Sequence, residues 1–154
     1  MPRRMTERER EAFLAEPRVA VLSVAGGGER PPLAAPCFYA YEPGGDISFF
    51  TNTGRRRARK VERIRRAGHV SLTVQRPEPP YRYVTAEGTA MNADSSPTAD
   101  EVVAIARRYM PEEHAQALAA SELGDPESTF LVFRVRPDRW LTADFSDEAA
   151  AEQG

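Results

Sequence analysis

Residues 33–66 read LAAPCFYAYEPGGDISFFTNTGRRRARKVERIRR, and this segment predicts two paired strands followed by a basic helix. Residues 33–41 favour a strand, in which Pro36 indicates a sheet edge or an interruption of the hydrogen-bond ladder. Glu42 to Asp46 carries the glycines of a hairpin turn, so residues 46–52 should return antiparallel to the first strand. Beyond them, apolar side chains recur every three residues among arginines, which predicts a helix that lies on a surface.

The sequence on either side of this segment predicts a mainly β chain with a few short helices. Capping-box patterns at Thr6–Glu9 and Thr98–Glu101 mark two helix starts, and Pro111 marks a third. The other predicted strands are residues 18–25, 69–76, 81–92 with a bulge or bend at Gly88, 129–136 and 139–145. Consecutive strands joined mostly by hairpins disfavour a parallel sheet and favour an antiparallel barrel with appended helices. The glycine-rich motifs of Rossmann and P-loop folds are absent from the sequence.

The length and residue types limit the other possibilities. The 154 residues fit a single domain over residues 1–145, with an acidic tail at 146–154 that we expect to be frayed. One cysteine, Cys37, and two histidines cannot form a disulfide or a closed Cys/His zinc site, so we expect no metal. No apolar run approaches the roughly 18 residues of a membrane span, and the first residues lack a signal-peptide core. We therefore expect a cytoplasmic protein without a membrane partner.

Charge is distributed unevenly along the chain. The formal net charge is −2, yet residues 55–66 contain eight basic side chains and one acid, a local charge of +7 that leaves −9 for the rest. A basic island on an acidic chain indicates an anionic ligand with a defined site, and it disfavours nucleic acid as a partner. Of the 21 basic residues, Lys60 is the only lysine. A compact ammonium suits a tight phosphate site better than a planar guanidinium does.

The junction between the second strand and the basic helix is the best candidate for this site. Thr51 ends the strand and Lys60 lies in the first turns of the helix. A hydroxyl, an ammonium and the free N–H groups of a helix start are what a phosphate group requires. Arg63, one turn further along, is expected to point at solvent.

These motifs, taken in order, resemble those of the pyridoxamine 5′-phosphate oxidase-like family of flavin and deazaflavin oxidoreductases. The matching elements are Pro36–Tyr39 with Glu42–Asp46, Phe50–Asn52, Arg59–Lys60, Tyr81–Gly88 and Pro137–Leu141, and the likeness covers nearly the whole chain. The resemblance implies an antiparallel split β-barrel of the FMN-binding type with peripheral short helices. It also implies a homodimer with the cofactor site at the subunit interface.

The resemblance also implies roles for individual residues. Pro36, Cys37 and Phe38 would line the flavin or deazaflavin ring, and Phe50, Thr51 and Asn52 would border the ribityl phosphate. Arg59 and Lys60 would hold the phosphate, with Arg57 in place of a hydroxyl contact that the family pattern usually has. Tyr83 occupies the position of a glutamine of the oxidase, and Tyr83, Arg139 and Trp140 would serve the partner's site.

The same resemblance suggests the chemistry. The C-terminal arginine–histidine pattern with which the true oxidase binds pyridoxal is not reproduced, so a true pyridoxamine phosphate oxidase is not expected. The sequence is closer to the actinobacterial branch that uses coenzyme F420, whose long anionic tail would suit the arginines at 55–57; FMN is the alternative cofactor. We expect hydride transfer with a small organic substrate, with water, Tyr39 or Tyr83 as proton donor. A carrier with little turnover and a haem-binding relative, with His69 as axial ligand, remain the other interpretations.

Overall fold

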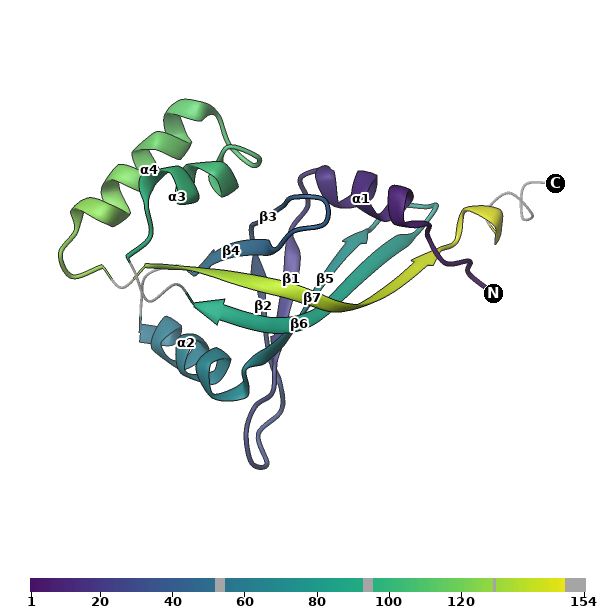
Figure 1. Cartoon of the computed structure of the whole chain (residues 1–154), viewed down its shortest axis with the longest axis horizontal. Coiled ribbons are helices and arrows are strands. Elements are labelled where there is room, and N and C mark those ends of the chain that lie inside the picture. Colours follow the sequence, from purple (N-terminus) through teal and green to yellow (C-terminus); the bar gives the residue numbers. More distant parts are fainter. Residues whose placement is uncertain (52–54, 93–95, 129, 149–154) are drawn as a thin grey trace.

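Seven antiparallel strands form one curled sheet in the computed structural model, which describes residues 1–51, 55–92, 96–128 and 130–148 (Figure 1). The elements are α1 (Glu7–Ala15), β1 (Ala20–Val24), β2 (Leu33–Cys37), β3 (Tyr39–Tyr41), β4 (Ile47–Thr51), α2 (Arg55–Ala67), β5 (His69–Arg76), β6 (Arg82–Asn92), α3 (Ala99–Ala106), α4 (Glu112–Gly124) and β7 (Leu131–Asp144). The strand order is β2-β1-β5-β6-β7-β4-β3. The predicted antiparallel split barrel with short helices is therefore confirmed. Within the described residues no helix is long and apolar enough to cross a membrane.

A single residue, Phe38, joins the two edges of this sheet. Strand β2 pairs with β1 at one edge, whereas β3 pairs with β4 at the other. Because β2 and β3 are consecutive in the chain, the sheet has to curl until its edges meet at Phe38. The prediction of one continuous strand over residues 33–41 is thus wrong: the chain changes partner at Phe38, which makes two strands of it.

The C-terminal strand differs from its prediction in the opposite way, because β7 is one strand where two were expected. It runs through Pro137, which has no N–H to donate, and the pairing register with β6 shifts between Glu87 and Gly88. A Cβ at Gly88 would lie 2.1 Å from the Arg136 carbonyl oxygen, so only glycine allows this approach. The bulge predicted at Gly88 is confirmed, and it is what lets β7 continue past the proline.

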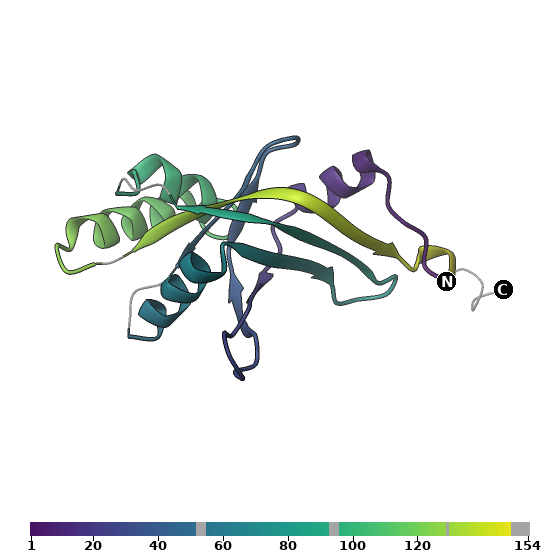
Figure 2. The ribbon, with the colours of Figure 1, turned by 60° about the horizontal axis from the view of Figure 1, so that its bottom comes forward.

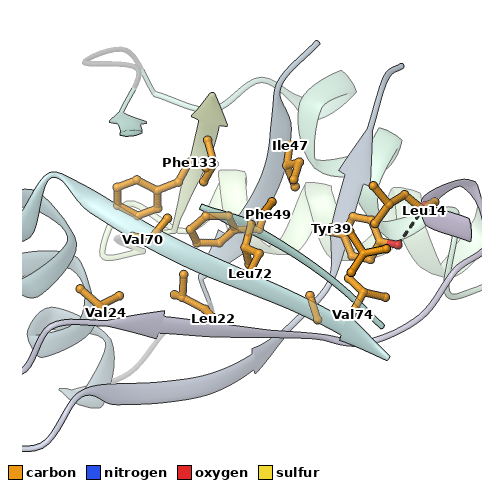
Figure 3. Close-up of a cluster of buried hydrophobic side chains, with 14 of the residues drawn as sticks. Leu14, Leu22, Val24, Tyr39, Ile47, Phe49, Val70, Leu72, Val74 and Phe133 are labelled. Carbon is orange, nitrogen blue, oxygen red and sulfur yellow. Dashed lines mark hydrogen bonds between the residues drawn. The ribbon is translucent and has the colours of Figure 1, made fainter. Parts of the chain in front are cut away.

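The inner face of the sheet holds the main hydrophobic core (Figure 3). Leu22, Leu72 and Phe49 are 2% exposed or less, and α1 covers one end of the barrel with Phe13 and Leu14. Helix α2 covers the opposite end with Val61 and Ile64, as its predicted apolar stripe requires.

A second core lies on the other side of β4 and β7. Phe49 and Phe50 are adjacent in β4 and both are buried, because Phe50 packs under α3 and α4 instead of facing solvent. Figures 1 and 2 show α2, α3 and α4 gathered at one end of the sheet, with both termini at the other end.

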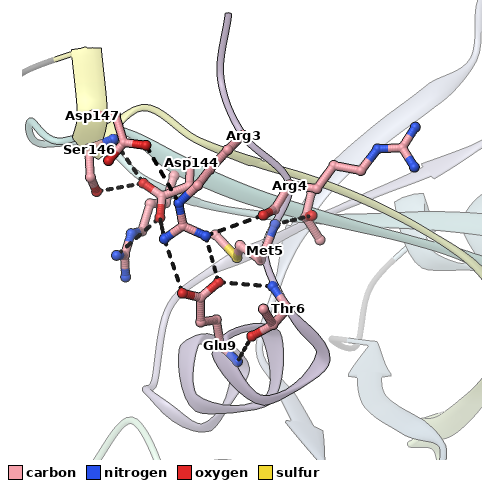
Figure 4. A network of polar contacts seen from close by, with 10 residues as sticks. Arg3, Arg4, Met5, Thr6, Glu9, Asp144, Ser146 and Asp147 are labelled. Atoms are coloured by element: carbon pink, nitrogen blue, oxygen red, sulfur yellow. Dashed lines mark hydrogen bonds and ion pairs between the residues drawn. The ribbon is translucent and has the colours of Figure 1, made fainter.

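The two ends of the chain are held together by a polar cluster, which we call the terminal clasp (Figure 4). Arg3 and Asp144 exchange two backbone hydrogen bonds, and the Arg3 guanidinium lies 2.9 Å from the Asp144 carboxylate. Arg82 contacts the same carboxylate at 3.2 Å, and the Ser146 amide and hydroxyl donate to it as well. Asp144 is 1% exposed, so these partners compensate a buried charge. Residues 149–154 of the predicted frayed tail lie outside the described residues.

Candidate functional site

Strand β4 ends at Thr51, a polar side chain that is almost completely buried. Only 1% of Thr51 is exposed, and its hydroxyl has no hydrogen-bond partner in the described part of the chain. Buried polar groups nearly always have a partner, because leaving one unpaired costs about 1–3 kcal/mol. Thr51 therefore marks a place where a bound ligand would supply a missing hydrogen bond.

Cys37 and Lys60 lie on the two elements next to the end of β4, since β2 contacts β4 and α2 follows β4 in the chain. Tyr39 of β3 pairs with Phe49 of β4 in an antiparallel ladder. Cys37 comes two residues before Tyr39, and Thr51 comes two residues after Phe49. Since β2 also contacts β4, these two residues lie close together. Lys60, half-buried on α2, is close enough to act electrostatically on the Cys37 thiol. Burial raises the pKa of this thiol to about 12, and the Lys60 ammonium only partly opposes that rise. Cys37 is therefore a neutral thiol and not a nucleophile. We call Cys37, Thr51 and Lys60 the β4–α2 corner.

The free edge of β2 borders the same corner. Strand β2 is the last strand of the sheet order, so its backbone pairs with β1 on one side and with no described strand on the other. Pro36 and Ala34 on β2 are exposed, and proline is typical of such an edge. An unpaired strand edge offers backbone N–H and C=O groups to any planar molecule that carries complementary groups.

Two aromatic side chains predicted for the site belong to the second core. Phe38 stacks on Tyr109 with ring centroids 4.1 Å apart and meets Phe50 edge-on at 6.2 Å. Phe50 is 7% exposed and packs with α3 and α4. Both residues flank the corner in sequence, and their rings support it from the α3–α4 side.

The two tyrosines considered as proton donors occupy different environments. Tyr39 is fully buried, and its hydroxyl donates a hydrogen bond to the Leu14 carbonyl at 2.9 Å (Figure 3). Burial raises the pKa of Tyr39, although the neighbouring Arg108 opposes this rise. Tyr83 is 41% exposed on the outer face of β6. Of the two hydroxyl groups, only that of Tyr83 is placed where a substrate can reach it.

The outer face of the sheet carries an apolar surface. Thr85 of β6 pairs with Thr73 on one side and Leu141 on the other, and Thr73 in turn pairs with Val21. Side chains paired in this way share one face of a sheet. The exposed apolar side chains in this region are Val19, Val21, Tyr81, Tyr83 and Leu141, which we call the outer apolar face.

The remaining predicted site residues are dispersed. Arg139 is exposed and pairs with Glu87, whereas Trp140 is half-buried between Tyr41 and the Arg10 guanidinium. The structure therefore separates these two neighbours onto opposite faces of β7. Asn52 and the side chain of Arg57 lie outside the described residues.

Arg63, which was expected to point at solvent, is half-buried and lines a hollow of about 530 Å3 together with Arg30, Arg59 and Arg66. The turn between β1 and β2 reaches this side of α2 and forms the other wall of the hollow, a contact between distant parts of the sequence.

The sequence predicted an exposed apolar face that carries Tyr81, Tyr83 and residues of the strand 130–135. The two tyrosines do lie on the outer apolar face, whereas Phe130, Val132, Phe133 and Val135 are buried in the two cores.

Comparison with known proteins identifies the fold family. The family model described as pyridoxamine 5′-phosphate oxidase matches residues 6–144. No curated protein sequence matches the chain.

Several solved structures share the fold at low sequence identity. The conserved hypothetical protein Rv2991 of Mycobacterium tuberculosis aligns with a TM-score of 0.75 and 19% identity, over 94% of this chain and 88% of that one. A protein named F420 reductase aligns with a TM-score of 0.60 and 20% identity, over 85% and 94% of the two chains. HutZ, described as a haem storage protein of Vibrio cholerae, aligns with a TM-score of 0.64 and 16% identity, over 90% and 94%. These likenesses show a common fold.

Proposed function

Because this chain belongs to the pyridoxamine 5′-phosphate oxidase family, we propose that it is an oxidoreductase that binds coenzyme F420 and transfers hydride to or from a small organic substrate in the cytoplasm. FMN is the alternative cofactor. The observation that carries the proposal is the buried Thr51 hydroxyl without a partner, beside Lys60 and the free edge of β2.

The corner fits the phosphate group of such a cofactor. The Thr51 hydroxyl would donate to a phosphate oxygen, and the Lys60 ammonium and the Arg59 guanidinium would neutralise its charge. Arg57 is proposed as a further cation, and Phe50 and Asn52 as the border of the ribityl chain. Charge-assisted hydrogen bonds of this kind are about twice as strong as neutral ones.

The free edge of β2 fits the ring. Backbone groups of Pro36, Cys37 and Phe38 would hold the pyrimidine part of a flavin or deazaflavin, whose N–H and C=O groups match those of a strand edge. When bound, the cofactor supplies the hydride chemistry, and the protein fixes its orientation and excludes water. Tyr83, with its exposed hydroxyl, is the proposed proton donor, and water is the alternative.

We propose that a second copy of the chain covers the outer apolar face. Val19 is 50% exposed and Leu141 39%, and several exposed apolar side chains on one face of a sheet mark an interaction surface. A two-fold partner placed here would bring Tyr83 and Arg139 of one protomer toward the β2 edge of the other. Trp140, packed against Tyr41, would support the strand that carries Arg139.

The charge of α2 favours coenzyme F420 over FMN. A phosphate monoester carries a charge of about −2 at neutral pH, whereas residues 55–66 carry +7. The lactate and glutamate tail of F420 would use the surplus, and the neighbour named F420 reductase agrees with this choice.

Binding of FMN and F420 to the wild type and to Thr51→Val tests the proposal. Fluorescence titration should show both cofactors binding, and the valine should weaken binding by about 1.5–3 kcal/mol, the usual worth of a hydrogen bond to a charged group. Thr89→Val, at an exposed position of β6, is the control and should change little. The Thr51→Val variant should have the same free energy of unfolding as the wild type or a higher one, because the substitution removes an unpaired buried hydroxyl. No binding of either cofactor at tens of micromolar would exclude the proposal.

The haem-binding alternative rests on His69, which is exposed at the start of β5, and on the likeness to a haem storage protein. An absorption spectrum of the purified protein separates the alternatives, since flavin, deazaflavin and haem absorb in different regions. A turnover assay then separates an enzyme from a carrier.

A further inference from the structure

The hollow between α2 and the turn that joins β1 to β2 is strongly basic. Arg30 from the turn and Arg59, Arg63 and Arg66 from α2 line it, and Glu62 is the only acid among the residues that form it. The Glu62 carboxylate lies 3.2 Å from the Arg66 guanidinium, so its charge is paired with that of Arg66. Within the described residues, the other three guanidinium groups have no carboxylate within ion-pair distance. We call these four arginines the arginine groove.

The arginines of α2 form a row along one face of the helix. Arg59, Arg63 and Arg66 follow one another at intervals of four and three residues, which places their side chains on one face of a helix. From Arg59 to Arg66 the helix rises about 10 Å, since each residue adds about 1.5 Å. Like charges at this spacing repel one another, so the free protein retains an unfavourable interaction that a bound anion would remove. One small anion cannot contact a row of this length.

The turn opposite this row allows the backbone to come close. Gly27 and Gly28 both have positive φ angles, 75° and 58°, which side chains rarely adopt. A Cβ on Gly26 would lie 2.1 Å from the Pro31 carbonyl oxygen, so this position also requires glycine. The three glycines leave the hollow without side chains on that wall, next to Arg30.

Lys60 belongs to a different face of the same helix. Successive residues of an α-helix are turned by about 100°, so Lys60 lies about 100° around the helix from Arg59, and it is close enough to Cys37 to act on its thiol electrostatically. The β4–α2 corner and the arginine groove are therefore neighbouring sites, with Arg59 at their boundary. Arg59 is shared, so occupancy of the corner leaves Arg30, Arg63 and Arg66 of the groove available.

We propose that the arginine groove is a second anion site, which binds a flexible chain of two or more phosphate or carboxylate groups beside the corner. The chain is either a free oligoanion or an extension of the bound cofactor. If the chain is an extension of the bound cofactor, the inference rests on the proposed function. If it is a free oligoanion, the inference is independent of that function.

Calorimetric titration with inorganic triphosphate, in the absence of cofactor, tests the site itself. Arg30→Gln combined with Arg63→Gln should weaken triphosphate binding at least tenfold. The control combines Arg8→Gln with Arg65→Gln, which removes the same charge from two exposed positions outside the groove, and should change affinity by less than twofold. An equal loss in the control, or no binding to the wild type at low salt, would overturn the proposal.

A further variant tests whether the two sites are separate. Lys60→Ala, in the corner, should leave triphosphate affinity within twofold of the wild type. If triphosphate binding depends on Lys60 and not on Arg30 and Arg63, the groove is not a site of its own. This result does not depend on whether any flavin or deazaflavin binds.

The source of the oligoanion is identified with F420 that carries its glutamate tail and F420 from which the glutamates have been removed. If the cofactor tail occupies the groove, the Arg30→Gln/Arg63→Gln variant loses affinity only for the form with glutamates. If both forms bind the variant as they bind the wild type while triphosphate binding is lost, the groove takes a free oligoanion.

Discussion

Lys60 differs from the twenty arginines of the chain in its chemistry and in its position. It is half-buried beside Cys37, and three arginines of the same helix face the arginine groove. We expect Lys60→Ala to weaken cofactor binding by about 1.5–3 kcal/mol, because it removes a hydrogen bond to a charged group. Fluorescence titration measures the loss.

Arg65→Ala is the matched control for Lys60, since it removes the same charge from an exposed position of α2. We expect it to cost less than about 0.5 kcal/mol of binding free energy, as exposed charges do. If the two variants lose the same affinity, the cofactor responds to the net charge of the helix and the corner has no special role.

At the scale of elements, the bulge in β6 is the place where one added side-chain atom should reduce stability most. Gly88→Ala would place a Cβ 2.1 Å from the Arg136 carbonyl oxygen, and neither strand can move without loss of pairing. We expect the free energy of unfolding to fall by about 1–3 kcal/mol, the usual cost of overpacking. Urea denaturation measures it. Gly124→Ala is the control, because no atom lies within 4 Å of its Cβ position, and it should be nearly neutral.

The sequence predicted most elements because their signals are local. The capping box at Thr6, the glycine turn before β4 and the three-residue spacing of Val61 and Ile64 all depend on neighbouring residues, and all are present. The two errors concern pairing. Nothing in the sequence at Phe38 indicates that the chain changes its pairing partner there. At Pro137 a strand normally ends, because proline has no N–H to donate, and here the strand continues only because of the bulge opposite it in β6.

The same distinction applies to the site. Thr51 and Lys60 are close in sequence, so a strand–helix junction was enough to predict that Thr51 ends a strand and Lys60 follows on a helix, as the structure shows. Arg30 reaches the arginine groove only through the fold, because its turn lies far from α2 in sequence. Tyr39 and Tyr83 could not be told apart in sequence, since one-residue shifts in register decide which face of a sheet a side chain occupies.

At the scale of the whole molecule, the terminal clasp makes stability depend on pH. Burial by itself would raise the pKa of Asp144, but hydrogen bonds from Ser146 and the charge of Arg82 outweigh it, so the pKa is lowered. The folded protein therefore binds this proton less readily than the unfolded chain, whose Asp has a pKa of about 3.9. The stabilisation is complete above that value and is lost as the pH falls through the lower folded pKa.

We expect Asp144→Asn to lower the free energy of unfolding by about 2–3 kcal/mol at pH 7, since it removes hydrogen bonds to a charged group. As the pH falls below about 3.9 and through the lowered pKa of Asp144, the wild type should lose this advantage progressively. Urea denaturation of both proteins at several pH values measures the difference. A difference that stays constant with pH would mean that the charge of Asp144 does not contribute.

The outer apolar face determines the expected state of assembly. We expect sedimentation to show a homodimer of about twice 17.1 kDa. Leu141→Glu places a charge on this face and should shift the protein to a folded monomer with weaker cofactor binding. Leu123→Glu, on α4 and 37% exposed against 39% for Leu141, is the control and should remain dimeric. A wild-type monomer that binds a full equivalent of cofactor would exclude the shared site.

The position of β4 in the sheet has a consequence for synthesis on the ribosome. Strand β4 pairs with β3, only three residues long, and with β7, which follows α3 and α4 near the end of the chain. At roughly 5–20 residues per second, β7 is translated several seconds after β4. Thr51 is therefore without its neighbour Leu131 until translation is almost finished. We therefore expect the proposed cofactor to bind only after β7 has paired, so a chain truncated before β7 should be recovered without it.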